Sequence, residues 1–198
     1  PTELLSEARA FTDTAIISIC RYSGEDWDRK LQKIEAGDCL LTSKEFIEKS
    51  DAIFERGDFY LTEAEEAMVN QVKENFANVV VVLNVGGMVD TSWFAKDERI
   101  SSVLLALQGG MEGGLAMADI LCGSVCPSGR LTDTYATDIR DYPSTAEFHT
   151  SVHYAEYTED IYVGYRYFET IPGAGEKVNY PFGYGLSYTT FDITALEV

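Results

Sequence analysis

The chain has 198 residues, 45% of them hydrophobic and 12% aromatic, which is enough for a substantial core and too apolar for a disordered segment. Its formal net charge of -18 disfavours binding to nucleic acid or to an anionic membrane and suits a neutral ligand or a cation. An alternative interpretation is that the charge serves only to keep the protein soluble. No apolar run is long enough to span a bilayer, so we expect no membrane partner.

The first segments alternate between helical and strand patterns. Residues 3–12 (ELLSEARAFT) are predicted to form a short amphipathic helix. Residues 14–20 (TAIISIC) are an almost unbroken apolar run, typical of a parallel strand buried on both faces. A long polar stretch, residues 21–58, follows and contains a possible helix over residues 42–55. Connections of this length in compact domains are often functional.

The clearest helix begins after Thr62. Thr62 and Glu65 have the spacing of a capping box, in which each residue satisfies a free backbone N–H group at the helix start. The apolar residues that follow recur at helical spacing: Met68, Val69, Val72 and Phe76.

The alternation continues to about residue 121. Residues 78–84 (NVVVVLN) are predicted to be a second buried strand, 90–94 a short helix and 102–107 a third strand. Residues 109–114 (GGMEGG) form a turn that leads into a helix over 115–121. The pattern predicts an α/β fold, a mostly parallel sheet flanked by helices in an α/β sandwich.

The composition changes from Cys126 onward. The remaining chain is rich in Tyr, Gly and Pro, and we predict an irregular C-terminal part with short antiparallel pieces. Its aromatic side chains fit either sugar stacking or, more commonly, structural packing. We treat residues 1–198 as a single domain.

The cysteines and the N-terminal residue bear on the expected cellular compartment. The spacing of Cys20, Cys39, Cys122 and Cys126 does not make a zinc set, and we expect neither a metal nor a cofactor. Free, partly buried thiols in a reducing compartment fit best, although two disulfides stay possible. We therefore expect a cytoplasmic location. Because the chain begins with Pro1 instead of methionine, we expect its N-terminus to have been trimmed.

Polar segments follow the first and third predicted strands. In open parallel sheets ligands bind at the carboxyl ends of strands, which directs attention to residues 21–29 and 108–112. The first segment combines three carboxylates with Gly24 and Trp27, the residue types that glycoside cleavage uses. Taken alone it is also an ordinary charged loop. The glycines of the second segment lack the Lys-Ser/Thr of a phosphate-binding loop.

Seven segments, taken in order, resemble glycoside hydrolase family 3, and together they span nearly the whole chain. They are SGEDWDR (23–29), GDFYLT (57–62), VVVVLNVG (79–86), QGGMEGG (108–114), ADILCGSVCPSGRLT (118–132), EDIYVGYRYF (159–168) and YPFGYGLSYT (180–189).

The resemblance implies the acid/base-supplying domain of a retaining β-glycosidase, most simply a β-glucosidase. SGEDWDR is similar to the family's acid/base loop, which places the catalytic carboxylate at Glu25. A (β/α)8 barrel of the same parent protein, absent from this chain, would carry the aspartate nucleophile. Trp27 and Tyr22 are the candidate substrate-binding residues on the leaving-group side. We expect a small carbohydrate substrate, a β-glucoside, and expect the isolated chain to be nearly inactive.

Three questions stay open at this stage. A β-xylosidase or arabinofuranosidase of the same family is an alternative, as is a non-catalytic carbohydrate-binding or scaffolding domain. Residues 30–56 are longer than in simple relatives, and we expect them to shape the leaving-group side or to contact the barrel.

Overall fold

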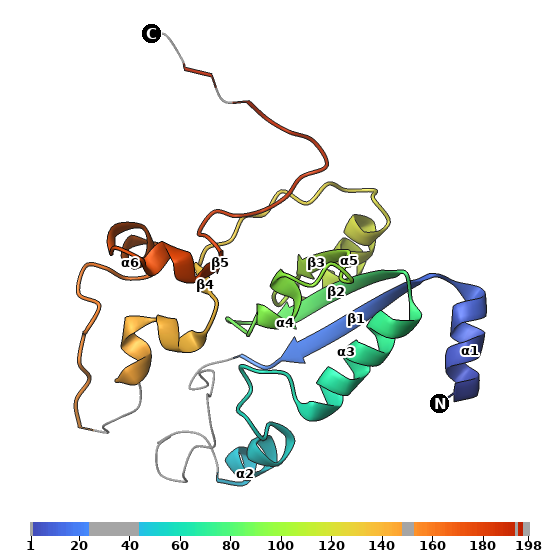
Figure 1. Ribbon diagram of the computed structural model, residues 1–198, viewed down its shortest axis with the longest axis horizontal. Coiled ribbons are helices and arrows are strands. Elements are labelled where there is room, and N and C mark those ends of the chain that lie inside the picture. The colour runs from blue at the N-terminus through green and yellow to red at the C-terminus, as the bar shows by residue number, and fades with distance from the viewer. Residues whose placement is uncertain (1, 24–43, 148–152, 193, 196–198) are drawn as a thin grey trace.

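A computed structural model of the chain describes residues 2–23, 44–147, 153–192 and 194–195 (Figure 1). The long elements of this part are α1 (Thr2–Phe11), β1 (Thr14–Arg21), α2 (Lys44–Ile53), α3 (Glu63–Asn75), β2 (Asn78–Val85), α4 (Ser92–Ala95), β3 (Ser102–Leu105) and α5 (Gly113–Leu121). The later elements are β4 (Tyr135–Ala136), α6 (Tyr165–Thr170) and β5 (Val178–Tyr180), with the 3-10 turns η1 (Ile139–Asp141), η2 (Pro143–Ala146) and η3 (Ala174–Lys177).

A parallel sheet of order β1-β2-β3 organises the first part of the molecule. β1 pairs with β2 from Thr14↔Asn78 to Arg21↔Val85, and β2 pairs with β3 from Val80↔Ser102 to Leu83↔Leu105. This confirms the predicted α/β fold with a parallel sheet and flanking helices. The three strands end at the same edge, so the segments that follow them leave the sheet side by side.

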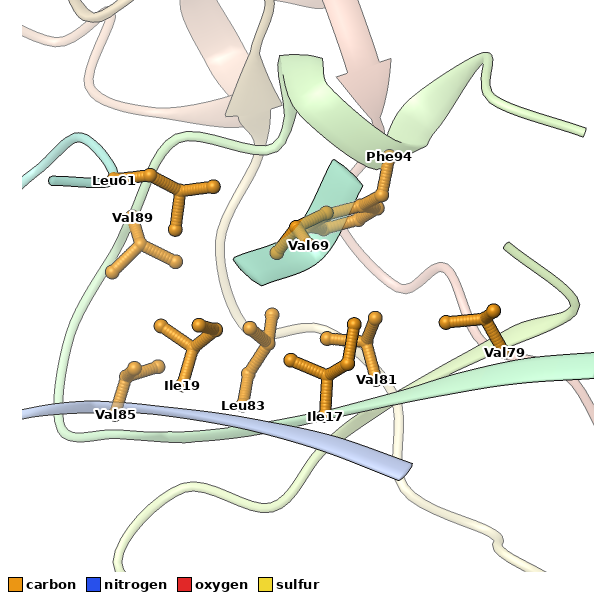
Figure 2. Packing of buried hydrophobic residues seen from close by; sticks show 10 residues of the cluster. All are labelled: Ile17, Ile19, Leu61, Val69, Val79, Val81, Leu83, Val85, Val89 and Phe94. Carbon is orange, nitrogen blue, oxygen red and sulfur yellow. The ribbon is translucent and has the colours of Figure 1, made fainter. Parts of the chain in front are cut away.

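The core lies on the face of the sheet that carries the odd-numbered residues of β1 and β2 (Figure 2). Val79, Val81 and Val85 are fully buried there. Val69 of α3 and Phe94 of α4 pack against this face. Burial of apolar surface contributes about 25 cal/mol per Å², so this cluster is the main source of stability for the strands that position the site.

The prediction that residues 14–20 are buried on both faces was wrong. β1 is buried on one face only: Ile17, Ile19 and Arg21 are buried, whereas Ile16 is 59% exposed. β1 lies at the edge of the described sheet, and its even-numbered side chains do not face α3 and α4. An apolar residue on an exposed face looks the same in the sequence as one in the core.

The other predicted boundaries agree with the structure to within a few residues. The capping box of Thr62 and Glu65 is present, and Val69 is buried, but Met68 is 40% exposed. β3 ends at Leu105 instead of residue 107, and Leu107 adopts a left-handed backbone conformation with φ of 52°. α5 begins at Gly113, two residues earlier than predicted.

The C-terminal part has the predicted short antiparallel pairing, with Tyr135 opposite Tyr180. A small second core forms around Ala136, Phe168 and Ala174. Helix α6 was not predicted; it follows Gly164, whose φ of 61° lies in the region that favours glycine. The last described residues extend away from the body of the molecule (Figure 1).

Cys20, Cys122 and Cys126 are free and exposed, so the expectation of partial burial was wrong for these three, and Cys39 lies outside the described residues. No described helix has the length and apolar character that a membrane span requires. Within the described ranges, no group of three or more His, Cys, Asp or Glu side chains is arranged to hold a metal ion.

Candidate functional site

The candidate site begins where β1 ends. Tyr22 follows β1 directly and is 60% exposed at the carboxyl edge of the sheet. The candidate acid/base Glu25 and the candidate platform Trp27 lie outside the described residues. The structure describes the residues that lead into the SGEDWDR sequence, and the contacts of Arg21 and Ser23 hold the backbone there.

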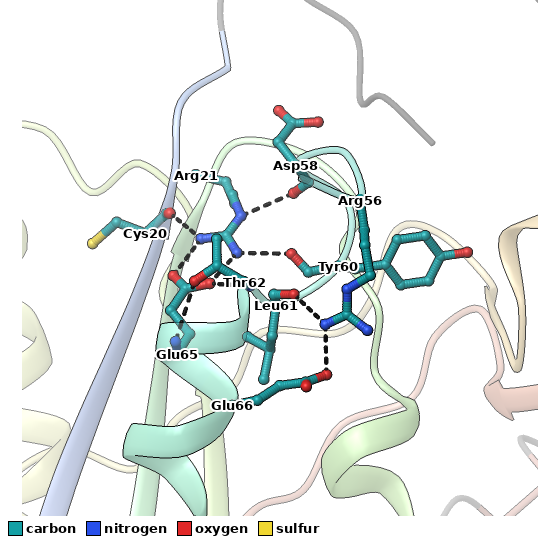
Figure 3. Close-up of polar contacts among 9 residues, drawn as sticks. All are labelled: Cys20, Arg21, Arg56, Asp58, Tyr60, Leu61, Thr62, Glu65 and Glu66. Atoms are coloured by element: carbon teal, nitrogen blue, oxygen red, sulfur yellow. Dashed lines mark hydrogen bonds and ion pairs between the residues drawn. The ribbon is translucent and has the colours of Figure 1, made fainter. Parts of the chain in front are cut away.

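Arg21 lies at the centre of a buried polar network (Figure 3). Its Nε donates to the carbonyl of Asp58 at 2.9 Å, and its terminal nitrogens donate to the carbonyls of Cys20 at 2.7 Å and Tyr60 at 2.9 Å. The same two nitrogens donate to the two carboxylate oxygens of Glu65 at 2.8 and 2.6 Å. All five guanidinium N–H groups thus have an acceptor.

This network joins both sides of the long polar stretch. Arg21 is the residue at which the chain leaves β1, and Asp58 and Tyr60 belong to the strand-free segment by which it returns. The guanidinium also lies 4.7 Å from the centroid of the Phe54 ring, just beyond α2. One buried cation therefore fixes the exit and the return of the chain that contains the candidate acid/base.

Glu65 has two roles at the start of α3. Its carboxylate pairs with Arg21, and it also accepts a hydrogen bond at 2.9 Å from the backbone N–H of Thr62, which completes the capping box. Burial alone would raise the pKa of Glu65, but the hydrogen bonds from Arg21 and Thr62 outweigh it and hold the pKa below its ordinary value. The carboxylate is therefore charged when the network forms.

Three strand ends converge beside this network. The side-chain amide of Gln108, after β3, donates to the carbonyl of Ser23, after β1, at 3.0 Å. Gly86, which follows β2, lies against both residues. The sequence directed attention to these segments through the strand-end rule, but it did not single out Arg21 or Gln108. The one local signal was the capping box, which identified Glu65 as a helix cap and not as the partner of Arg21.

The contacts of Arg21 and Ser23 hold the backbone rigidly at the point where the polar stretch begins. A buried, fully hydrogen-bonded cation and a strand-end clamp hold the chain at Arg21 and at Ser23, and Tyr22 between them is exposed. Functional side chains carried by loops on such rigid scaffolds are a common way to build binding and catalytic sites.

Comparison with known families and proteins gives a consistent result. The model of the glycosyl hydrolase family 3 C-terminal domain matches residues 4–188. Beta-glucosidase A of Butyrivibrio fibrisolvens is 62% identical over 191 residues, which is 96% of this chain and 23% of that protein. A beta-glucosidase of Ruminococcus albus is 40% identical over 97% of this chain and 17% of its own length. This chain therefore spans about a quarter or less of these relatives.

Solved structures are also similar. A beta-glucosidase from Paenibacillus barengoltzii has a TM-score of 0.77 and 40% identity, and the match covers 96% of this chain and 18% of that one. Beta-glucosidase 3B from Thermotoga neapolitana, in complex with glucose, has a TM-score of 0.76 and 34% identity over 96% of this chain and 24% of that one.

Proposed function

This chain belongs to the family of glycosyl hydrolase family 3 C-terminal domains, and we propose that it supplies the general acid/base, Glu25, of a retaining β-glucosidase. We take residues 1–198 as one α/β domain that acts together with a (β/α)8 barrel of the same parent protein. The observation that carries the proposal is the place of Ser23, the first residue of the SGEDWDR sequence. Ser23 follows β1 at the carboxyl edge of a parallel sheet, and the backbone there is held by contacts of Arg21 and Gln108.

The proposed reaction has two steps. An aspartate of the barrel attacks the anomeric carbon while Glu25, in its protonated form, gives its proton to the departing glycosidic oxygen. The leaving group departs as a neutral alcohol, and a covalent glycosyl-enzyme remains. Glu25, now a carboxylate, then takes a proton from water. That water attacks the anomeric carbon, displaces the aspartate and releases the sugar with its configuration retained.

The acid step sets a requirement on Glu25. The carboxyl group must be protonated when substrate arrives, so its pKa in the complete site must lie above that of an ordinary glutamate. A negatively charged nucleophile a few ångströms away and partial burial both act in that direction. The nucleophile belongs to the proposed barrel, so its influence on the pKa of Glu25 acts only in the complete site.

The coverage of the relatives supports a partner domain. This chain matches only 23% of Beta-glucosidase A of Butyrivibrio fibrisolvens, so most of that protein lies outside the match. Large apolar side chains also lie exposed beyond the end of β3: Leu107 is 51% exposed, Leu115 is 67% exposed and Met111 is fully exposed. Exposed apolar side chains in one segment suit a contact with another domain.

Tyr22 and Trp27 are proposed to contact the leaving-group side of the substrate. Tyr22 supports this by its place and its exposure, one residue beyond β1 and three residues before Glu25. An aromatic ring can cover one face of a sugar ring while its polar edge stays in water.

A pentoside is the second candidate substrate. An exo-alpha-(1->6)-L-arabinopyranosidase of Bifidobacterium longum is 39% identical over 147 residues, 73% of this chain. The sugar that precedes the scissile bond is proposed to bind mainly to the barrel, which makes this domain compatible with either sugar. Rates for a panel of aryl glucosides, xylosides and arabinosides, measured on the full-length enzyme, separate these candidates.

The proposal is tested by replacing Glu25 with alanine in the full-length enzyme. Loss of the general acid lowers kcat/KM, which reports the first step, by about 10²–10⁴-fold for substrates with poor leaving groups and by much less for those with good leaving groups. Asp26→Ala, which removes the adjacent carboxylate, is the matched control and should not show this dependence on the leaving group. Unchanged hydrolysis of an alkyl glucoside by Glu25→Ala would overturn the assignment.

A further inference from the structure

We propose that Gln108 is a positioning residue for Glu25, and that it acts by holding the backbone carbonyl of Ser23 across the end of β2. This inference rests on the proposed role of Glu25 and adds to it a residue 83 positions away in the sequence. Three observations on described residues carry it: a hydrogen bond, a missing side chain beneath that bond, and a strained backbone beside it.

The hydrogen bond joins the outer strands of the sheet. Gln108 follows β3 and Ser23 follows β1, and β2 lies between these strands. The amide nitrogen of Gln108 nevertheless reaches the Ser23 carbonyl at 3.0 Å, so its side chain passes over the carboxyl end of β2. The acceptor belongs to the backbone two residues before Glu25. The contact therefore holds the backbone at Ser23, the residue at which the SGEDWDR sequence begins.

Gly86 provides the room for this contact. A Cβ atom at Gly86 would overlap the Cβ of Ser23 and would lie 2.7 Å from the amide nitrogen of Gln108, far closer than a normal van der Waals contact. Only glycine at the end of β2 allows the two residues to meet.

The backbone at Leu107 is strained in a way that points to the same purpose. Its φ of 52° lies in the left-handed region, which residues other than glycine and asparagine rarely adopt. The Leu107 side chain is 51% exposed in this chain, so packing against the rest of the described domain does not explain the conformation. Strain of this kind persists where the surrounding structure holds it, often at functional sites. Here the left-handed residue lies two residues beyond the end of β3 and immediately before Gln108.

These contacts hold Ser23 against the sheet, while the Arg21 network holds the chain two residues earlier. An acid that is displaced by about 1 Å from its proton acceptor loses on the order of 10²-fold in rate. Loosening Ser23 should therefore slow the steps in which Glu25 transfers a proton and leave other steps nearly unchanged.

The test uses Gln108→Glu and Gly86→Ala in the full-length enzyme. Glutamate has nearly the same shape as glutamine, but its carboxylate has no proton to donate to the Ser23 carbonyl at neutral pH. We expect kcat/KM, which reports the first step, to fall by about 10- to 100-fold for an alkyl glucoside and by less than about threefold for a dinitrophenyl glucoside, whose leaving group needs no acid. Gly86→Ala should give the same pattern by displacing Ser23. Gln108→Ala serves as a second way to remove the donor without adding a charge.

The matched controls make the same chemical changes elsewhere. Gln71→Glu introduces the same change on the exposed surface of α3, and Gly129→Ala adds a methyl group where the structure has open space. Both should leave kcat/KM unchanged for either leaving group. An equal loss of rate for both leaving groups in Gln108→Glu, Gln108→Ala and Gly86→Ala would contradict a positioning role.

A double variant separates this proposal from the one on which it rests. If Gln108 acts through Glu25, then Gln108→Glu should cause no further loss when Glu25 is already alanine, because the group that it positions is gone. Independent, multiplicative losses would contradict the positioning role. If Glu25→Ala alone shows no dependence on the leaving group, the proposed function fails. If Glu25→Ala shows the dependence on the leaving group and Gln108→Glu does not, only the positioning role fails.

Discussion

Replacing Glu65 by alanine should destabilise the fold, because Glu65 is the counter-charge of the buried Arg21. The Arg21 side chain is 2% exposed and that of Glu65 is 24% exposed, and two hydrogen bonds of 2.8 and 2.6 Å join them. Removing the carboxylate leaves a buried guanidinium without its counter-charge, which typically costs about 3–5 kcal/mol. Because Arg21 keeps its three backbone carbonyl acceptors, we expect a value near the lower end, about 3 kcal/mol.

Urea denaturation of the 198-residue chain, followed by circular dichroism, measures this loss. With a urea m-value of about 2 kcal/mol per M, the midpoint should fall by about 1.5 M. Glu66→Ala is the matched control, because Glu66 lies next to Glu65 on α3 and pairs with Arg56 at the surface, where both side chains are about half exposed. An exposed pair contributes about 0–1 kcal/mol. Equal losses for Glu65→Ala and Glu66→Ala would refute the view that Arg21 and Glu65 support the fold.

The penalty should also depend on pH. The pKa of Glu65 in the folded chain lies below its ordinary value of 4.5, so the folded state favours the charged carboxylate. The stability that this group contributes is complete above the ordinary pKa and is lost as the pH falls through the lower, folded value. The difference in stability between the original chain and Glu65→Ala should therefore be constant from pH 6 to 8 and shrink below about pH 4. A difference that grows on acidification would contradict the assigned pKa direction.

Three further substitutions, one of them an exposed control, test the two cores by the same denaturation assay. Leu83→Ala, in the buried core, should cost about 2–5 kcal/mol, whereas Leu115→Ala, at a side chain that is 67% exposed, should cost less than about 0.5 kcal/mol. Tyr142→Phe removes the hydroxyl that donates to the Thr134 carbonyl at 2.5 Å and accepts from the Ala136 N–H at 2.8 Å, and should cost about 1–3 kcal/mol. A loss at Leu115 equal to that at Leu83, or no loss at Tyr142, would contradict the corresponding assignment.

The fold could be predicted where the signal is local. Apolar runs identified β1 and β2, and the Thr62–Glu65 capping box placed the start of α3 to the residue. Helix α6 was missed because its short aromatic segment, YRYFET, has no helical period and depends on Gly164 to begin. The exposed face of β1 was missed because burial depends on which elements pack against a strand, and composition alone does not encode that.

The site was only partly predictable for the same reason. The strand-end rule selected the segments that contain Tyr22 and Gln108, but the bond between Gln108 and Ser23 joins residues 85 positions apart. The Arg21–Glu65 pair joins residues 44 positions apart, and no periodic pattern relates such positions. Glu25 itself was chosen by resemblance to a family. Local spacing made it one of three neighbouring carboxylates.

The most direct test of the central claim, that Glu25 is the acid/base, is the product formed by Glu25→Ala in the presence of azide. With an aryl glucoside that has a good leaving group, the first step proceeds and the covalent intermediate waits for water that has lost its base. Azide is a nucleophile that needs no base, so it should accelerate turnover and yield a glucosyl azide of retained, β configuration. No acceleration, or glucose as the only product at every azide concentration, would contradict the assignment of Glu25.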